Sequence, residues 1–219
     1  MGLTISYTLT ARQPLSEAAL LKFTEHTATL ALQIGCTQAQ GPEFGGPPDW
    51  KMWQLPDGSW TGEPRSPVEG YSVSILPGYG CEHATFGLCR YEDVPGWKFT
   101  AFCKTQYAAR YGIDHFLHCH RRVISLLDLW HDFGVELEVC DEGEYWETRS
   151  VECLRQRVDV YDRLVAAVAG TISDETAEHG VKIAAEIFDD VRFERLEAEG
   201  RAQFARQLAE LKEELERLR

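Results

Sequence analysis

Apolar and polar residues alternate along several short segments of the chain, and this period of two predicts β-strands. The clearest case is the start of the chain, where Leu3, Ile5 and Tyr7 alternate with threonine and serine. The strands predicted in this way cover residues 3–9, 36–39, 71–75, 86–88, 97–101 and 135–139. Proline–glycine pairs occupy the connections among the third, fourth and fifth strands, which is typical of a meander.

Other segments repeat apolar residues every three or four positions, which is the period of an amphipathic α-helix. The predicted helices follow Pro14 up to Gly35, cover residues 114–133, and extend from Val151 to Gly170. The order is therefore β-α-β, a three-strand meander, then α-β-α. This order predicts an α+β domain over residues 1–170, with a mixed sheet of about six strands and helices mainly on one face.

Residues 41–68 interrupt the regular pattern with proline, glycine and three tryptophans. Asp57-Gly58 is a hairpin turn signal, so part of this stretch could form a small two-stranded flap. Long loops of this kind either act as lids or cover the core. We expect a covering role, because tryptophan is usually buried.

Residues 174–219 differ from the rest of the chain. They contain 13 acidic and 8 basic residues and no proline, which predicts an acidic helical arm. Apolar residues recur near its end at steps of four and three, the spacing of a coiled-coil seam. The seam consists of Phe204, Leu208, Leu211, Leu215 and Leu218. We expect this seam to bind another protein or a second copy of the chain.

The formal net charge of −13 restricts the possible partners. An acidic surface repels phosphate backbones and anionic lipids, so we expect neither nucleic-acid nor membrane binding. The seven cysteines show no framework spacing, which favours reduced thiols in the cytoplasm. The first residues lack the pattern of a signal peptide, and no apolar run is long enough to span a bilayer.

Three polar clusters each follow a predicted strand, at residues 80–83, 103–107 and 140–146. A meander leaves its first and third strands pointing the same way, and a helical crossover keeps that direction for the last strand. The three clusters should therefore share one edge of the sheet, where sheet proteins often bind ligands. The candidate ligand-binding residues are Glu82, Lys104, Gln106, Tyr107, His120, Asp141, Glu142, Tyr145 and Trp146.

Two features of these clusters point to chemistry. His120 lies on the helix stripe that should face the sheet, so it needs a hydrogen-bond partner or a functional role. Residues 141–147 place four carboxylates beside Tyr145 and Trp146. Paired carboxylates in different environments suit acid–base catalysis, and the two rings suit a cationic ligand. The acids also complement the dipole at a helix start.

Thiol and metal chemistry are alternative interpretations. The candidate nucleophiles are Cys81, Cys103 and Cys119, with His83, His118 or His120 as base. No nucleophile signature surrounds them, so we interpret these cysteines as packed residues. Residues 81–83 and 115–120 hold possible zinc ligands, and a helix brings positions 115 and 119 onto one face. The segment lacks CxxC and HExxH spacing, so we expect no metal and no cofactor.

We expect a non-catalytic binding or interaction protein, with a strand-end ligand pocket and a helical assembly arm. The ligand would be small, peptidic or cationic. The alternative is a small hydrolase or transferase that uses Asp141 or Glu142, His120 and Lys104 in the same pocket. No motif fixes a reaction, so the sequence leaves open whether the protein is an enzyme.

Overall fold

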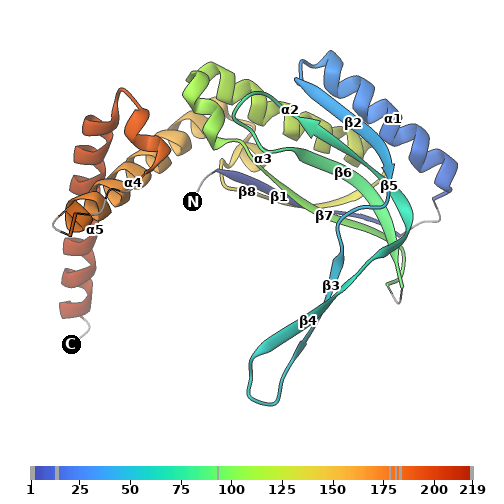
Figure 1. The fold of residues 1–219 in the computed structure, drawn as a ribbon, viewed down its shortest axis with the longest axis horizontal. Helices are drawn as coiled ribbons and strands as arrows, with labels where there is room; N and C mark the ends of the chain where they lie inside the picture. Colours follow the sequence, from blue (N-terminus) through green and yellow to red (C-terminus); the bar gives the residue numbers. More distant parts are fainter. Residues whose placement is uncertain are drawn as a thin grey trace. The chain divides into compact units, whose positions relative to one another are not determined.

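The computed structural model of the 219-residue chain describes residues 3–12, 15–92, 94–177, 179–180, 182 and 184–217. The chain divides into two compact units, which meet in sequence at Val151 and Glu152. The first unit contains a β-sheet and the second is helical, and each is described by itself (Figure 1). The predicted boundary between residues 170 and 174 falls within a continuous helix of the second unit.

The sheet unit contains all six strands that the alternating pattern predicts. Its elements are β1 (Thr4–Ala11), α1 (Glu17–Gln33), β2 (Gln38–Phe44), β3 (Asp49–Gln54), β4 (Trp60–Arg65), β5 (Pro67–Leu76), β6 (Ala84–Tyr91), β7 (Trp97–Lys104), the 3-10 helix η1 (Gln106–Tyr111), α2 (Ile113–Asp132), β8 (Glu136–Asp141) and α3 (Tyr145–Thr148). Strands β3 and β4 form a separate hairpin, and the other six form one sheet. The predicted α+β fold with a C-terminal helix is thus confirmed.

The main sheet has the strand order β2-β5-β6-β7-β1-β8, and every pair is antiparallel. The sheet was expected to be mixed, and the difference has a simple cause. Strand β1 lies between β7 and β8, so the two strands joined by α2 are parallel in direction without pairing. Strands β5, β7 and β8 therefore run the same way, and their carboxyl ends lie at one edge of the sheet.

The core lies between the sheet and helices α1 and α2 (Figure 1). The alternating residues of β1 that were predicted to face inward are buried, including Ile5 and Tyr7. Tyr7 stacks on Phe86, which in turn stacks on Trp130 of α2. Phe23 of α1 meets the edge of Trp130, so both helices contribute to the same aromatic cluster. Such contacts add to the favourable burial of apolar area.

The β3–β4 hairpin is the two-stranded flap that the sequence suggested. Its turn is stabilised by Asp57, whose Oδ1 accepts hydrogen bonds from the backbone N–H and hydroxyl of Ser59. Gly58 has φ +84°, a conformation that glycine adopts without strain. Trp60 is 65% exposed, so it does not cover the core as expected. The side chains of Trp50 and Trp53 lie outside the described part of the structure.

At its base the hairpin is held to the sheet by charged and polar contacts. Asp49 accepts hydrogen bonds from Arg65 of the paired strand and from Lys98 of β7. The hydroxyl of Tyr91 donates to the Pro47 carbonyl at 2.8 Å. The base is therefore fixed, whereas several apolar side chains nearer the tip are exposed.

The helical unit contains α4 (Val151–Ala177), the 3-10 helix η2 (Glu186–Asp189) and α5 (Phe193–Arg217). The predicted end of the third helix at Gly170 is wrong, because α4 continues for another seven residues. A Cβ at Gly170 would lie 2.0 Å from Glu197 Oε1, and one at Gly200 would lie 2.2 Å from the Arg163 carbonyl oxygen. Both glycines therefore allow close approach of α4 and α5, and Gly170 does not mark a helix end.

Ion pairs join the two helices at their packed segments. Arg192, which directly precedes α5, contacts Asp162 of α4 at 3.0 Å, and Arg201 of α5 contacts Asp174 of α4 at 2.6 Å. Among the residues that the structure describes, no helix is long and apolar enough to cross a membrane.

Candidate functional site

The three polar clusters meet at the shared edge of the sheet. The backbone N–H of Glu82 donates to the Lys104 carbonyl at 2.9 Å, which joins the first cluster to the second. Strand β1 connects the second cluster to the third. The N–H of Thr105 donates to the Leu3 carbonyl at 3.1 Å, and the N–H of Glu142 donates to the Thr4 carbonyl at 3.1 Å.

A buried chain of three polar side chains lies at this edge, formed by Thr105, His120 and Asp141. His120 is on α2, Thr105 follows β7, and Asp141 ends β8. His120 Nδ1 lies 2.9 Å from Thr105 Oγ1, and His120 Nε2 lies 3.1 Å from Asp141 Oδ2. In a neutral ring, Nε2–H donates to the carboxylate and Nδ1 accepts the hydroxyl proton. We call these three residues the strand-end network.

Asp141 also organises the turn from β8 into α3. Its Oδ1 accepts the N–H of Gly143 at 2.8 Å, and its Oδ2 accepts the N–H groups of Tyr145 and Trp146, both at 2.9 Å. Burial acts to raise the pKa of Asp141, but the hydrogen bond and charge of His120, with the backbone N–H groups, outweigh it. The pKa is therefore lowered from its usual value, and the carboxylate stays ionised.

A hydroxyl, a histidine and an aspartate in a hydrogen-bonded chain are the groups of a nucleophilic triad. Here, however, Thr105 and His120 are 0% exposed and Asp141 is 5% exposed. Both ring nitrogens and both carboxylate oxygens are engaged within the protein. The strand-end network thus satisfies buried polar groups and ties β7, α2 and β8 together.

Two more of the predicted site residues hold the first strand in place. Gln106 is buried, and its Oε1 accepts the backbone N–H of Leu3 at 3.2 Å. Glu142 is exposed, and its Oε2 accepts the N–H of Thr4 at 2.8 Å. Both side chains therefore bind the backbone of β1, and these contacts do not indicate a shared ligand site.

The remaining predicted residues lie nearer the surface. Lys104 Nζ lies 3.5 Å from Glu82 Oε1, and both side chains are partly exposed. Tyr107 is 41% exposed. Tyr145 and Trp146 are half-buried against the core. The guanidinium of Arg149 lies 4.5 Å from the Trp146 ring centroid, so a cation of the protein itself already occupies a face of that ring.

A second group, which sequence reasoning did not assemble, lies where the β5–β6 loop meets α2. We call Cys81, His115, Cys119 and Arg122 the thiol cluster. Cys119 Sγ lies 3.5 Å from His115 Nε2 and 4.0 Å from Arg122 Nη1, and it accepts a hydrogen bond from Cys81. The helical period placed positions 115 and 119 on one face of α2. The candidate bases proposed from the sequence were nevertheless His83, His118 and His120, and not His115.

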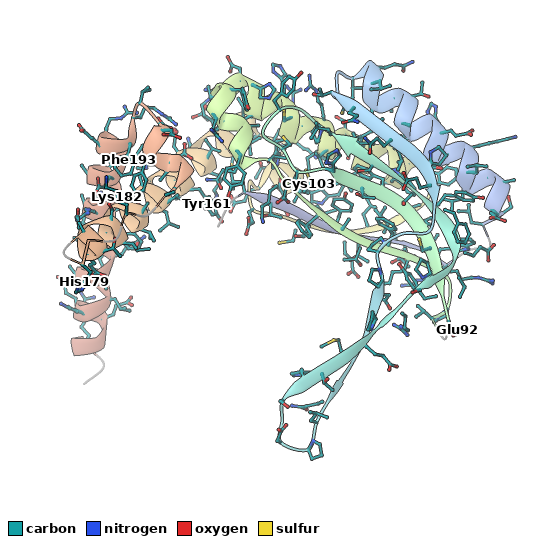
Figure 2. All side chains as sticks on the ribbon, viewed as in Figure 1. Glu92, Cys103, Tyr161, His179, Lys182 and Phe193 are labelled. Atoms are coloured by element: carbon teal, nitrogen blue, oxygen red, sulfur yellow. The ribbon has the colours of Figure 1, made fainter. Side chains whose placement is uncertain are left out.

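The thiols of this region differ in their ionisation. The hydrogen bond from Cys81, together with His115 and Arg122, lowers the pKa of Cys119 to about 7 against the effect of burial. The same hydrogen bond and burial raise the pKa of Cys81 well above its ordinary value. Burial also raises the pKa of Cys103, whose thiol donates to the Glu82 carbonyl. Cys103 lies in β7 of the sheet unit (Figure 2).

All seven cysteines are free thiols. Within the described residues, no three His, Cys, Asp or Glu side chains are grouped so as to hold a metal ion. Comparisons of the chain with models of protein families, with curated proteins and with solved structures found no match.

Proposed function

We propose that the protein is a non-catalytic interaction protein that assembles through the C-terminal half of α5. The observation that carries this proposal is an apolar stripe exposed on that half of the helix. Phe204, Leu208 and Leu211 are 38%, 56% and 52% exposed, although they follow the spacing of a packed seam.

The two halves of α5 have different surroundings within the helical unit. In the first half, Leu196 is 2% exposed and Gly200 lies against α4. In the second half, the described side chains from residue 204 onward are all exposed. The sequence continues the stripe with Leu215 and Leu218; the side chain of Leu215 and the whole of Leu218 lie outside the described part of the structure. A two-heptad helix is marginal in water by itself, so a partner stabilises it.

The charges beside the stripe favour a second copy of the chain in parallel orientation. In heptad terms Lys212 lies on one flank of the stripe and Glu214 on the other. In a parallel pair, the Glu214 flank of one helix faces the Lys212 flank of its partner. In an antiparallel pair, the Lys212 flanks would face each other, which brings like charges together.

The strand edge contributes little to the case for catalysis. The enzyme alternative uses His120 with Asp141 or Glu142, and of these His120 and Asp141 are buried and hydrogen-bonded within the protein. The proposal therefore assigns them to the core and leaves Lys104, Glu82 and Tyr107 as the accessible positions for a small or cationic ligand. Free thiols suit a reducing compartment, so the proposal places the protein in the cytoplasm.

Light scattering of the full-length protein tests the assembly. We expect a mass near twice the 24.8 kDa of one chain, and near one chain for a Leu208→Glu/Leu211→Glu variant. Ala202→Glu/Ala209→Glu is the matched control, because it adds the same two charges at exposed positions of α5 away from the stripe and should remain dimeric. A monomeric wild-type protein, or a double variant that remains dimeric, contradicts self-assembly through this stripe.

A further inference from the structure

We propose that Cys81 and Cys119 form a redox-active dithiol, which a hydroperoxide oxidises to an intramolecular disulfide. The site lies in the sheet unit and is independent of assembly through α5. It rests on the geometry of the thiol cluster. The N–H of Cys81 donates to the Gly78 carbonyl at 3.2 Å, Gly78 lies directly against Cys119 Sγ, and two basic side chains adjoin that sulfur.

The basic side chains are placed asymmetrically. His115 and Arg122 both contact Cys119, at 3.5 Å and 4.0 Å. Each is held by a further bond: His115 Nε2 lies 3.0 Å from the Tyr79 carbonyl oxygen, and Arg122 Nη1 donates to the Pro77 carbonyl at 2.8 Å. Positive charge and hydrogen-bond donors stabilise a thiolate, so the negative charge of the pair resides on Cys119 at rest.

Other buried thiols of the protein show the opposite behaviour, although the charge of Arg122 also acts on Cys36. Burial raises the pKa of Cys36 to about 11 and that of Cys89 to about 11. Cys119 is equally hidden from solvent, yet its pKa is lowered to about 7. The difference follows from the side chains around Cys119 and not from its depth.

The two sulfurs differ in access. Cys119 has no exposed surface, and Gly78 closes over it so tightly that an added Cβ would lie 2.3 Å from its Sγ. Cys81 is half-buried, in the loop that follows Gly80. A hydroperoxide therefore meets Cys81 first, and Cys119 is placed behind it as the second thiol.

The reaction balances in two steps. Cys81 passes its proton to Cys119 along their hydrogen bond, and the Cys81 sulfur attacks one oxygen of the hydroperoxide. The O–O bond breaks, the leaving oxygen takes the proton back from Cys119 and departs as alcohol or water, and Cys81 becomes a sulfenic acid. The Cys119 thiolate then attacks the Cys81 sulfur, and hydroxide leaves and is protonated to water. Two thiols and one hydroperoxide give one disulfide, one alcohol or water, and one further water.

Closure of the disulfide requires a local movement of the loop. The sulfurs must approach from hydrogen-bond contact to a bond of about 2.05 Å. Gly78 and Gly80 lie on either side of Tyr79, and Gly80 has φ +78°, so the backbone can adjust here without moving β5 or β6. The product ties the loop covalently to α2.

Peptide mapping of the full-length protein tests the proposal. The protein is treated with a few equivalents of hydrogen peroxide, its free thiols are alkylated, and it is digested without reductant by trypsin and a glutamate-specific protease. Cleavage after Glu82 separates Cys81 from Cys89. We expect a linked pair made of residues 70–82 and 111–121, which disappears when dithiothreitol is added.

The rate of linkage tests the role of the basic neighbours. When hydrogen peroxide is in excess, attack of the Cys119 thiolate on the Cys81 sulfenic acid limits the rate of linkage. His115→Ala should then slow linkage about tenfold below pH 7, because a rise of about one unit in the pKa of Cys119 lowers its thiolate fraction by that factor. His118→Ala, on the exposed side of the same helix, should leave the rate unchanged. The proposal is overturned if Cys81 and Cys119 remain alkylatable while the exposed Cys140 is oxidised, if Cys119 links to Cys36 or Cys103, or if both histidine variants behave alike.

Discussion

The strand-end network and the outer half of α5 use their residues in opposite ways. At the sheet edge, polar side chains that resemble a reactive site are buried and satisfied by one another. On α5, leucines that resemble a packed seam are exposed. Residue type alone therefore does not distinguish residues that stabilise the fold from residues that serve function. Burial and the number of available partners do.

Removing the carboxylate of the strand-end network should have the largest effect on stability. Asp141→Ala leaves His120 and the N–H groups of Gly143, Tyr145 and Trp146 without their acceptor. We expect a loss of roughly 3–5 kcal/mol in the free energy of unfolding, measured by urea denaturation. Glu142→Ala, one residue away and exposed, should cost less than about 1 kcal/mol. Equal losses in the two variants would falsify the structural interpretation of Asp141.

The two glycines between α4 and α5 offer the next largest effect. Gly200→Ala places a Cβ against the Arg163 backbone, which cannot move away easily, and should cost roughly 1–3 kcal/mol. Gly170→Ala meets the flexible carboxylate of Glu197 and gains helix propensity, so it should be close to neutral. Thermal unfolding followed by circular dichroism measures both. A larger loss of stability in Gly170→Ala than in Gly200→Ala would mean that α4 and α5 do not pack as described.

Acid should weaken the sheet unit through Asp141. Its folded pKa is lowered, so its ionised form contributes stability above the unfolded pKa of about 3.9, and this contribution is lost as pH falls through the folded value. We expect the free energy of unfolding to fall below about pH 4 in the wild type. The fall should be smaller in Asp141→Asn, which has no carboxyl group to titrate at this position. Parallel urea titrations at neutral and acid pH compare the two proteins, and identical pH profiles would contradict the assignment.

The smallest effect concerns the charges that flank the α5 stripe. Lys212→Glu places acidic residues on both flanks, and exposed ion pairs contribute about 1 kcal/mol or less, or roughly fivefold in Kd. The weakening should diminish at high salt, because these charges are screened. Analytical ultracentrifugation of the wild type and the variant at two salt concentrations measures the Kd of the dimer and its salt dependence. A variant that dimerises more tightly at low salt would favour the antiparallel arrangement.

The sequence predicted the parts of the fold that depend on local periodicity. Ile5 and Tyr7 face the core as the alternation required, and His120 lies on the buried stripe of its helix. The partners of His120 depend on the strand order, and Thr105, although it lies in the cluster at residues 103–107, is not among the predicted site residues. A signal was present, since a residue that follows a buried strand and precedes a buried helix is itself a candidate for burial.

Contacts between distant segments could not be predicted in the same way. The sequence predicts a helix end at Gly170, because glycine is common at helix ends. Glycine is also common where two helices approach closely, and the residue that Gly170 approaches, Glu197, lies on another helix. The meeting of Cys81 with Cys119 depends on the path of the β5–β6 loop, which periodicity does not describe. The helical period places His115 on the same face of α2 as Cys119, but its contact with the β5–β6 loop depends on the path of that loop.

The position of β1 has a consequence for how the chain is made. The first strand of the sheet lies between β7 and β8, and the hydrogen bond from Thr4 to Glu142 spans 138 residues. During synthesis on the ribosome, β1 emerges long before either neighbour exists, so its two backbone edges stay open until most of the sheet unit has been translated. Loop closure over such separations is slow, and unpaired strand edges are prone to aggregation. The chain should therefore fold late, and its nascent form should depend on chaperones more than a protein with a local hairpin at its N-terminus.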